Sequence, residues 1–154
     1  MIFYMKRFAN IFSILLLVFS ILFSSFDVVQ NLSDYKWTNR VLIINAPISL
    51  SEKFQNQLIE IQQNYTGLRE RKIVLITIVG TKYSALDFTD PESNTQWKSL
   101  TKELEEVCHE SFEVVLIGLD GSEKLRQTEV LYKEDLFQLI DRMPMRRLEM
   151  NEND

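Results

Sequence analysis

Three short runs of apolar residues recur along the chain, and each is typical of a buried β-strand. They cover residues 40–45 (RVLIIN), 72–79 (KIVLITIV) and 112–118 (FEVVLIG). The runs are nearly continuous rather than alternating, which indicates a sheet covered on both faces. Ala46-Pro47 ends the first strand, because proline has no N–H to donate to a neighbouring strand.

Between the first two strands, apolar residues recur at helical spacing. We expect a helix over about residues 50–65. Residues 49–52 (SLSE) have the pattern of a capping box, and Gly67 is expected to stop the helix.

After the second strand, residues 80–89 are expected to form a polar loop. Asp90-Pro91 supplies a cap and a first-turn proline for a second helix that ends near His109. Its apolar stripe would consist of Trp97, Leu100, Leu104 and Val107. A last helix through residues 136–143 is expected to stop at Pro144.

An Asp-Gly turn follows the third strand, at residues 119–122 (LDGS), so residues 124–128 are expected to return antiparallel. The predicted order is strand, helix, strand, helix, hairpin, helix. The two strand–helix units favour parallel strands by the right-handed crossover rule, and the closing hairpin and helix are typical of a thioredoxin-like sheet. We therefore predict a thioredoxin-like α/β fold with a central mixed sheet, and a flavodoxin-like sheet as the second choice.

The N-terminus has the pattern of an export signal. Lys6 and Arg7 precede a thirteen-residue apolar core at residues 11–23, short for a membrane span but suitable for a signal peptide. The core has no polar face, which disfavours a buried helix. We expect residues 1–25 to act as a signal peptide or signal anchor. No cleavage site is clean, so an uncleaved anchor through residues 8–26 stays open.

Composition supports one globular domain and excludes several kinds of site. The chain has 154 residues, 45% hydrophobic and 25% charged, with a net charge of −5. Residues 1–25 hold only Lys6 and Arg7 as charged groups, so 15 basic and 22 acidic residues remain, a net charge of −7. This acidity disfavours nucleic acid as a partner. One cysteine, Cys108, and one histidine, His109, exclude a disulfide framework and a thiolate or histidine metal cluster, and we expect neither metal nor cofactor.

Three segments carry a resemblance to a known family. They are residues 37–42 (WTNRVL), residues 116–126 (LIGLDG and, after two residues, KLR) and residues 139–150 (LIDRMPMRRLEM). Together they resemble the DUDES domain family (DRO, URB, DRS, Equarin, SRPUL) over residues 30–150, which leaves residues 151–154 as a polar tail. The resemblance implies a thioredoxin-like fold found in secreted bacterial proteins and in animal extracellular matrix proteins, with no established catalytic activity.

Thiol chemistry on this fold requires a cysteine directly after the first strand, where the start of a helix lowers a thiol pKa. That stretch contains Ser49 and Ser51 and no cysteine, while Cys108 is expected near the C-terminal end of a helix. We therefore predict no catalytic residue. The helix start at Ser49 and Ser51 could hold an anion through its amides, although a plain cap is favoured. A serine hydrolase is disfavoured because no motif supports its base.

The segment near the C-terminus has the composition of an interface. Flexible methionines alternate with arginines that can hold carboxylates in two-point contacts. The predicted interaction surface consists of Arg142, Met145, Arg146, Arg147 and Glu149. The alternative is a C-terminal brace, in which methionines pack on the sheet and an arginine pairs with Asp141 or Asp120. Metal binding by the thioethers is disfavoured, since no histidine or cysteine is near.

These observations predict an exported, non-enzymatic thioredoxin-like binding module. Its partner would be an unknown protein or a component of the envelope or matrix, in the periplasm or outside the cell. Membrane contact would come only through an uncleaved N-terminal anchor. The alternative is an exported oxidoreductase of thioredoxin or peroxiredoxin type that uses Cys108.

Overall fold

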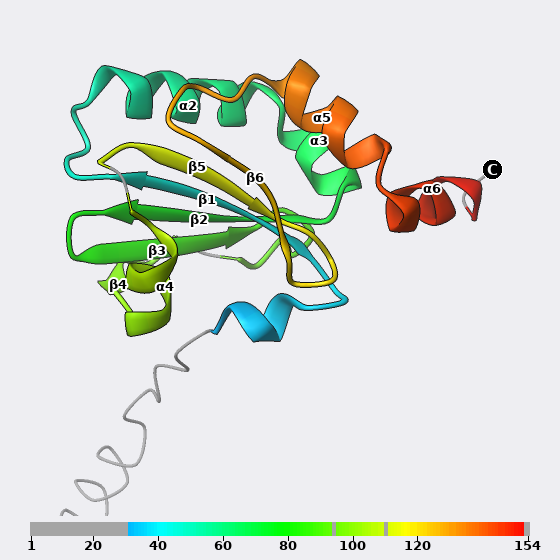
Figure 1. Cartoon of the computed structure of the whole chain (residues 1–154), viewed down its shortest axis with the longest axis horizontal. Helices are drawn as coiled ribbons and strands as arrows, with labels where there is room; N and C mark the ends of the chain where they lie inside the picture. Colours follow the sequence, from blue (N-terminus) through cyan, green and yellow to red (C-terminus); the bar gives the residue numbers. More distant parts are fainter. Residues whose placement is uncertain (1–30, 94, 110, 153–154) are drawn as a thin grey trace, which may run out of the picture.

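A six-stranded, mixed, open sheet forms the centre of this α/β protein (Figure 1). The computed structural model describes residues 31–93, 95–109 and 111–152. The strand order is β4-β3-β2-β1-β5-β6. The strands are β1 (Arg40–Ala46), β2 (Ile73–Val79), β3 (Lys82–Asp87), β4 (Lys98–Ser99), β5 (Glu113–Ile117) and β6 (Glu123–Gln127).

Strand β1 lies in the middle of the sheet and determines its directions. It pairs in parallel with β2, beginning at Arg40 opposite Ile73. On its other side it pairs antiparallel with β5, with Val41 opposite Ile117. The outer strands β3 and β6 are antiparallel to their neighbours. The sheet therefore contains one parallel pair, connected by a helical crossover, as expected for parallel strands.

Helices cover both faces of the sheet. The described residues contain α2 (Glu52–Gln63), α3 (Tyr65–Glu70), α4 (Lys102–Val107), α5 (Lys133–Asp141), α6 (Pro144–Asn151) and one 3₁₀ helix, η1 (Leu32–Tyr35). Helices α2, α3 and α5 lie over one face, and α4 and η1 lie over the other (Figure 1). Helix α6 extends beyond the sheet, at the end where β1 begins.

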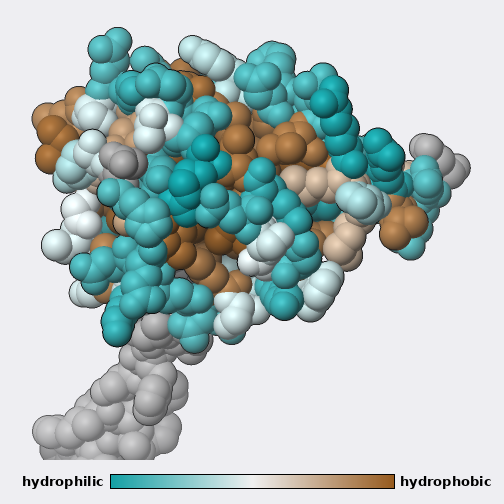
Figure 2. Space-filling model, in the orientation of Figure 1, coloured by the Kyte–Doolittle hydropathy of each residue, from teal (hydrophilic) through white to brown (hydrophobic). Residues whose placement is uncertain are grey.

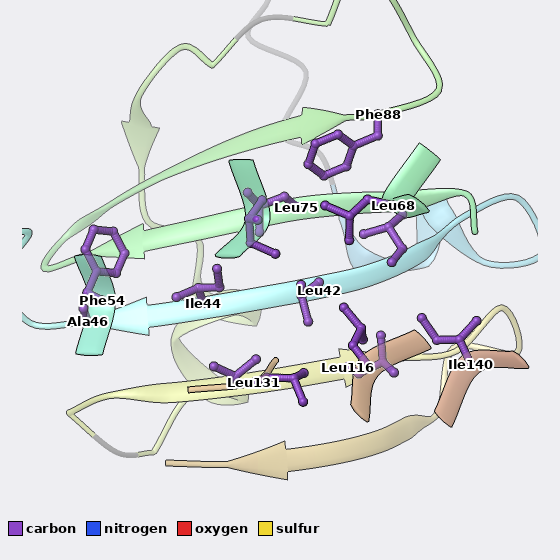
Figure 3. Packing of buried hydrophobic residues seen from close by; sticks show 14 of the residues in the cluster. Leu42, Ile44, Ala46, Phe54, Leu68, Leu75, Phe88, Leu116, Leu131 and Ile140 are labelled. Carbon is purple, nitrogen blue, oxygen red and sulfur yellow. The ribbon is translucent and has the colours of Figure 1, made fainter. Parts of the chain in front are cut away.

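The alternating side chains of β1 serve two hydrophobic clusters. Leu42 and Ile44 point toward the helices α2, α3 and α5, where Ile140 also packs (Figure 3). Val41 and Ile43 pack on the opposite side with Tyr35 of η1 and Leu104 of α4. The prediction that the apolar strands are covered on both faces is therefore confirmed. The predicted bounds of these three strands agree with the observed bounds within one residue.

The predicted polar loop at residues 80–89 is wrong, because β3 occupies most of it. Gly80, with a positive φ of 58°, makes a tight turn that returns the chain antiparallel to β2. Tyr83 and Ser84 are buried, whereas Lys82 is exposed. The polar residues of β3 give no strand pattern in the sequence, because this strand is stabilised by pairing with β2 rather than by an apolar pattern of its own.

The predicted helix from Asp90-Pro91 to His109 is also wrong in its first half. Asp90 accepts a hydrogen bond from the N–H of Glu92 and forms a turn, and none of the described residues between Asp90 and Thr101 is helical. Helix α4 begins only after Thr101, whose hydroxyl caps Leu104 at 3.3 Å. Trp97, assigned to the buried stripe, is 52% exposed.

The first helix begins and ends at different residues from those predicted. Ser51 caps it, not Ser49, since the Ser51 hydroxyl accepts from the N–H of Phe54. Gly67 does not stop the helix but lies inside α3. A Cβ at Gly67 would come within 2.5 Å of the Phe137 ring, so this glycine permits close packing of α3 and α5.

The predicted hairpin is confirmed. Residues 118–122 connect β5 to β6, with the N–H of Gly118 donating to the carbonyl of Ser122 at 2.9 Å. Gly121 has a φ of +76°, as the Asp-Gly signal requires. Asp120 supports the turn by accepting from the backbone and the hydroxyl of Ser122.

Gln57 joins α2 to the segment that precedes α5. Its buried amide donates to the carbonyl of Leu131 at 3.0 Å and accepts from the N–H of Leu131 at 2.7 Å. Replacing Gln57 with leucine leaves both groups of Leu131 without these partners, at about 1 to 3 kcal/mol each.

We therefore expect Gln57→Leu to lower the free energy of unfolding by roughly 2 to 6 kcal/mol in urea titrations. The matched control is Gln62→Leu on the exposed side of the same helix, expected to change it by less than about 0.5 kcal/mol. Equal unfolding free energies for the two variants would contradict this role of Gln57.

Candidate functional site

The residues predicted as an interaction surface lie at the C-terminal end of the domain. Arg142 directly follows α5, and Met145, Arg146, Arg147 and Glu149 lie in α6. Pro144 does not simply stop a helix: α5 ends at Asp141, and Pro144 occupies the first position of α6. Proline is suited to this position because its missing N–H would have no helical partner there. The chain changes direction at residues 142–143 and continues as a second helix.

Helix α6 presents charged side chains to the body of the protein and a mixed surface to solvent. Arg146 and Glu149 are three residues apart, so they share one side of the helix, and both are largely buried. Exposed side chains within residues 142–149 are Arg142, Pro144, Met145, Arg147 and Leu148. Figure 2 shows apolar and hydrophilic residues side by side at this end of the molecule.

The carboxylate of Asp141 forms ion pairs with two arginine side chains. Arg71 donates to both of its carboxylate oxygens, from Nε at 3.0 Å and from Nη2 at 2.6 Å. Arg146 Nε approaches the same carboxylate at 3.3 Å. Burial alone would raise the pKa of Asp141, but the two guanidinium groups outweigh burial and hold that pKa below its usual value.

Packing fixes the orientation of Arg71. Its guanidinium lies 3.9 Å from the centre of the Phe137 ring and donates to the carbonyl of Gly67 at 3.0 Å. An arginine stacked on an aromatic ring and bound at two points to a carboxylate has little freedom left. Arg71 therefore holds Asp141, and with it the end of α5, against α3.

Arg40, the first residue of β1, has the most deeply buried charge. Its side chain is 1% exposed. Nη1 donates to the carbonyl of Arg71 at 2.9 Å and to the Glu149 carboxylate at 3.2 Å. Burial lowers the pKa of Arg40, and Glu149 opposes that shift. Because a guanidinium does not lose its proton in proteins, a full positive charge remains inside.

We call Arg40, Arg71, Arg146, Asp141 and Glu149 the arginine cluster. Three guanidinium groups share two carboxylates in it. At its rim, Lys72 lies 3.7 Å from Glu149 and Glu70 lies 3.8 Å from Arg71, which adds one charge of each sign. The cluster therefore holds one positive charge more than its carboxylates neutralise.

A cavity of about 250 Å³ lies beside the arginine cluster, and we call it the Arg40 cavity. Its lining residues are Arg40, Leu119, Asp120, Lys124, Met143, Pro144 and Met145. Lys124 and Asp120 pair with each other at 2.7 Å, and this contact, followed by hydrogen bonds from Ser122, lowers the pKa of Asp120 to about 2. The remaining side chains form an apolar wall beside Arg40.

The start of α2 has the features of a plain helix cap. The Ser51 hydroxyl is occupied by the N–H of Phe54, and the exposed Ser49 contributes its carbonyl to the side chain of Gln55. The only histidine of the sequence, His109, follows the end of α4, and no hydrogen bond joins it to either serine among the described residues. The structure does not bring Ser49 or Ser51 together with the arginine cluster.

Cys108 lies at the end of α4, packed against the face of the sheet that α4 covers. Burial, and then the negative charge of Glu113, raise the pKa of this thiol to about 11. Glu113 is itself buried and bonds Arg126 at 2.8 Å. A thiol in this setting is protonated near neutral pH and is a poor nucleophile.

Sequence reasoning did not identify Arg40, Arg71 or Glu113 as important charges. A signal was present: Arg40 and Glu113 are charged residues next to apolar strand residues, and a charge in such a strand requires a partner when the strand is buried. Their partners, Glu149 and Arg126, are 109 and 13 residues away.

Comparison with known proteins identifies one family. Residues 31–149 match the family described as Domain of unknown function (DUF4174). No curated protein matches the chain, and no solved structure does. Within residues 31–152, apart from 94 and 110, no helix has the length and apolar character needed to cross a bilayer. The same described residues include no group of three or more histidine, cysteine or acidic side chains arranged to hold a metal ion.

Glu149 provides a direct test of the arginine cluster. Glu149→Gln keeps the size of the side chain but removes the carboxylate nearest to Arg40. We expect it to lower the free energy of unfolding by about 3 kcal/mol, as for removal of one partner of a buried ion pair. Glu152→Gln, an exposed change near the end of α6, is the control and should have almost no effect. Similar unfolding curves for both variants would show that Arg40 does not depend on Glu149.

Proposed function

This chain belongs to the DUF4174 family, a domain of unknown function, and we propose that it is an exported, non-enzymatic binding module with a thioredoxin-like fold. The observation that carries the proposal is the separation of its two candidate sites. The end of β1 where a redox nucleophile would lie has no thiol, whereas the opposite end carries the arginine cluster and a cavity.

Strand order supports the thioredoxin-like assignment. Four strands follow the order β2-β1-β5-β6, with β1 and β2 parallel and β5 and β6 forming the closing hairpin before α5. Strands β3 and β4 extend the sheet beyond β2. A flavodoxin-like sheet would continue with parallel strands, and the antiparallel pairing of β5 with β1 disfavours it.

We also propose that the resemblance to the DUDES domain family reflects a shared site. What supports this is the position of the three segments that carry the resemblance. Arg40 belongs to the first segment, Asp120 and Lys124 belong to the second, and Met143 and Met145 belong to the third. All five residues line the Arg40 cavity.

In this proposal the surface around the Arg40 cavity contacts the partner, a protein or a component of the envelope or matrix. Arg142, Met145 and Arg147 are its exposed members, and they can move to meet a partner. Arg146 and Glu149 instead attach α6 to the domain. The predicted interaction surface and the predicted brace are thus two sides of the same helix.

The reactivity of Cys108 tests the non-enzymatic part of the proposal. Because its pKa is about 11, iodoacetamide should alkylate the folded protein slowly at pH 7 and faster only as the pH approaches 11. Denatured protein, in which the thiol regains an ordinary pKa, is the control for reagent quality. Cys108→Ser should remain folded, with a stability loss within about 0.5 to 3 kcal/mol.

The competing function, an oxidoreductase that uses Cys108, gives the opposite results. It requires rapid alkylation at pH 7, and a peroxidase or disulfide-reductase activity that disappears in Cys108→Ser. Either result would overturn the non-enzymatic proposal.

Export depends on residues 1–25, which lie outside the described residues. We expect the protein to be recovered outside the cytoplasm. Replacing Lys6 and Arg7 with glutamate should retain it in the cytosol, because a signal requires a positive charge before its apolar core. Cell fractionation measures this distribution, and N-terminal sequencing separates a cleaved signal from an anchor. Wild-type protein found entirely in the cytosol would refute export.

A further inference from the structure

Arg40 has hydrogen-bond donors that the protein does not use. Its Nη1 donates to Arg71 and Glu149. Its Nε and Nη2 are buried and have no hydrogen-bond partner among the described residues. Leaving a buried, charged donor unpaired is costly, so this arrangement is unusual in a protein interior.

The two unused nitrogens form one edge of the guanidinium group. In a planar guanidinium, the Nε–H and one Nη2–H point in the same direction and lie parallel. This is the edge that meets the two oxygens of a carboxylate in a two-point contact. Glu149 contacts Arg40 through Nη1, and the edge formed by Nε and Nη2, although buried, has no partner among the described residues.

The charge of the surroundings favours an anion. The arginine cluster carries three guanidinium groups and two carboxylates, and its rim adds one charge of each sign. One bound monoanion would neutralise the cluster. Asp120, the remaining carboxylate of the cavity lining, is bonded to Lys124 at 2.7 Å, so its charge is largely compensated.

The wall of the Arg40 cavity indicates which kind of chemical group carries that anion. Leu119, Met143, Pro144 and Met145 are apolar, and the volume of about 250 Å³ is below the range of about 300 to 1,000 Å³ common for drug-sized ligands. Met143 and Met145 have unbranched side chains that can change rotamer and uncover Arg40. The space suits a group of a few carbon atoms.

We propose that the Arg40 cavity binds a carboxylate through Nε and Nη2 of Arg40, with a small apolar group against Leu119, Met143 and Met145. This inference rests on the proposed binding function and assigns its ligand class. The carboxylate can belong to a free short-chain acid or to the C-terminus of a peptide, and these sources share the same chemistry at Arg40.

The test is titration of the ¹⁵N-labelled full chain with 3-methylbutanoate, followed by the Nε–H resonance of Arg40. We expect a saturable shift at roughly millimolar concentration, the range reasonable for so small a ligand. The comparison probes are 3-methylbutanamide, which lacks the negative charge, and inorganic phosphate, which lacks the apolar group, and both should bind at least about tenfold more weakly. No saturable shift, or an equal response to either comparison probe, would overturn the proposal.

Variants connect the binding to this edge of Arg40. Arg40→Lys keeps the positive charge but cannot make the two-point contact, so affinity should fall at least about tenfold. If that variant does not fold, Met145→Trp narrows the cavity, leaves Arg40 in place and should weaken binding similarly. The control is Arg69→Lys on the exposed side of α3, outside the lining of the Arg40 cavity, where affinity should not change. Unchanged affinity in a folded Arg40→Lys or in Met145→Trp would overturn the site.

The peptide Ala-Ala-Leu, with a free or an amidated C-terminus, separates the two sources. Tighter binding of the free peptide than of 3-methylbutanoate indicates a chain terminus, and weaker binding indicates a free acid; both agree with the proposal. If Cys108 is alkylated slowly but no carboxylate binds, the proposed ligand class is wrong and the non-enzymatic function is not affected. Rapid alkylation would overturn the non-enzymatic function instead.

Discussion

A positive charge that cannot be removed lies at the start of the central strand, and the C-terminal helix α6 is paired with it through Glu149. Arg40 is buried in the sheet and must be neutralised there, because guanidinium groups stay protonated in proteins. Glu149 approaches it from α6, and the carbonyl of Arg71 approaches it from the residues before β2. A cation in a buried strand therefore determines where a helix more than 100 residues away must lie.

Helix α6 is consequently held by charge more than by apolar contact. Among the described residues of α6, only Arg146 is classed as buried, whereas α5 contributes Leu136 and Ile140 to the core. Buried ion pairs add less stability than their Coulomb attraction suggests, but they are specific in geometry. Such a helix has a fixed position, and its surface does not need to be apolar.

The two ends of β1 have different chemical characters. At the carboxyl end, where thioredoxin-like enzymes need a thiol, the chain has a plain serine cap. At the amino end, a guanidinium edge without a protein partner lies beside methionines that can rearrange. Arginine recognises a carboxylate by its planar geometry, without chemical change to either group, and this chemistry underlies the binding role that we propose for this end.

The sequence alone determined the elements whose stability is local. The three apolar strands, the Asp-Gly hairpin at Gly121 and the helix through Leu136 follow from periodicity and turn chemistry, and all are present. Composition also excluded disulfides, and the absence of a cysteine after the first strand was visible directly. Tertiary structure decided the rest. Strand β3 exists because β2 offers it a partner, and α6 lies where it does because Arg40 requires a carboxylate. The partner of Arg40 could not be predicted from the sequence, since any of the many acidic residues could pair with a guanidinium. Only the folded chain determines which carboxylate lies close enough to do so.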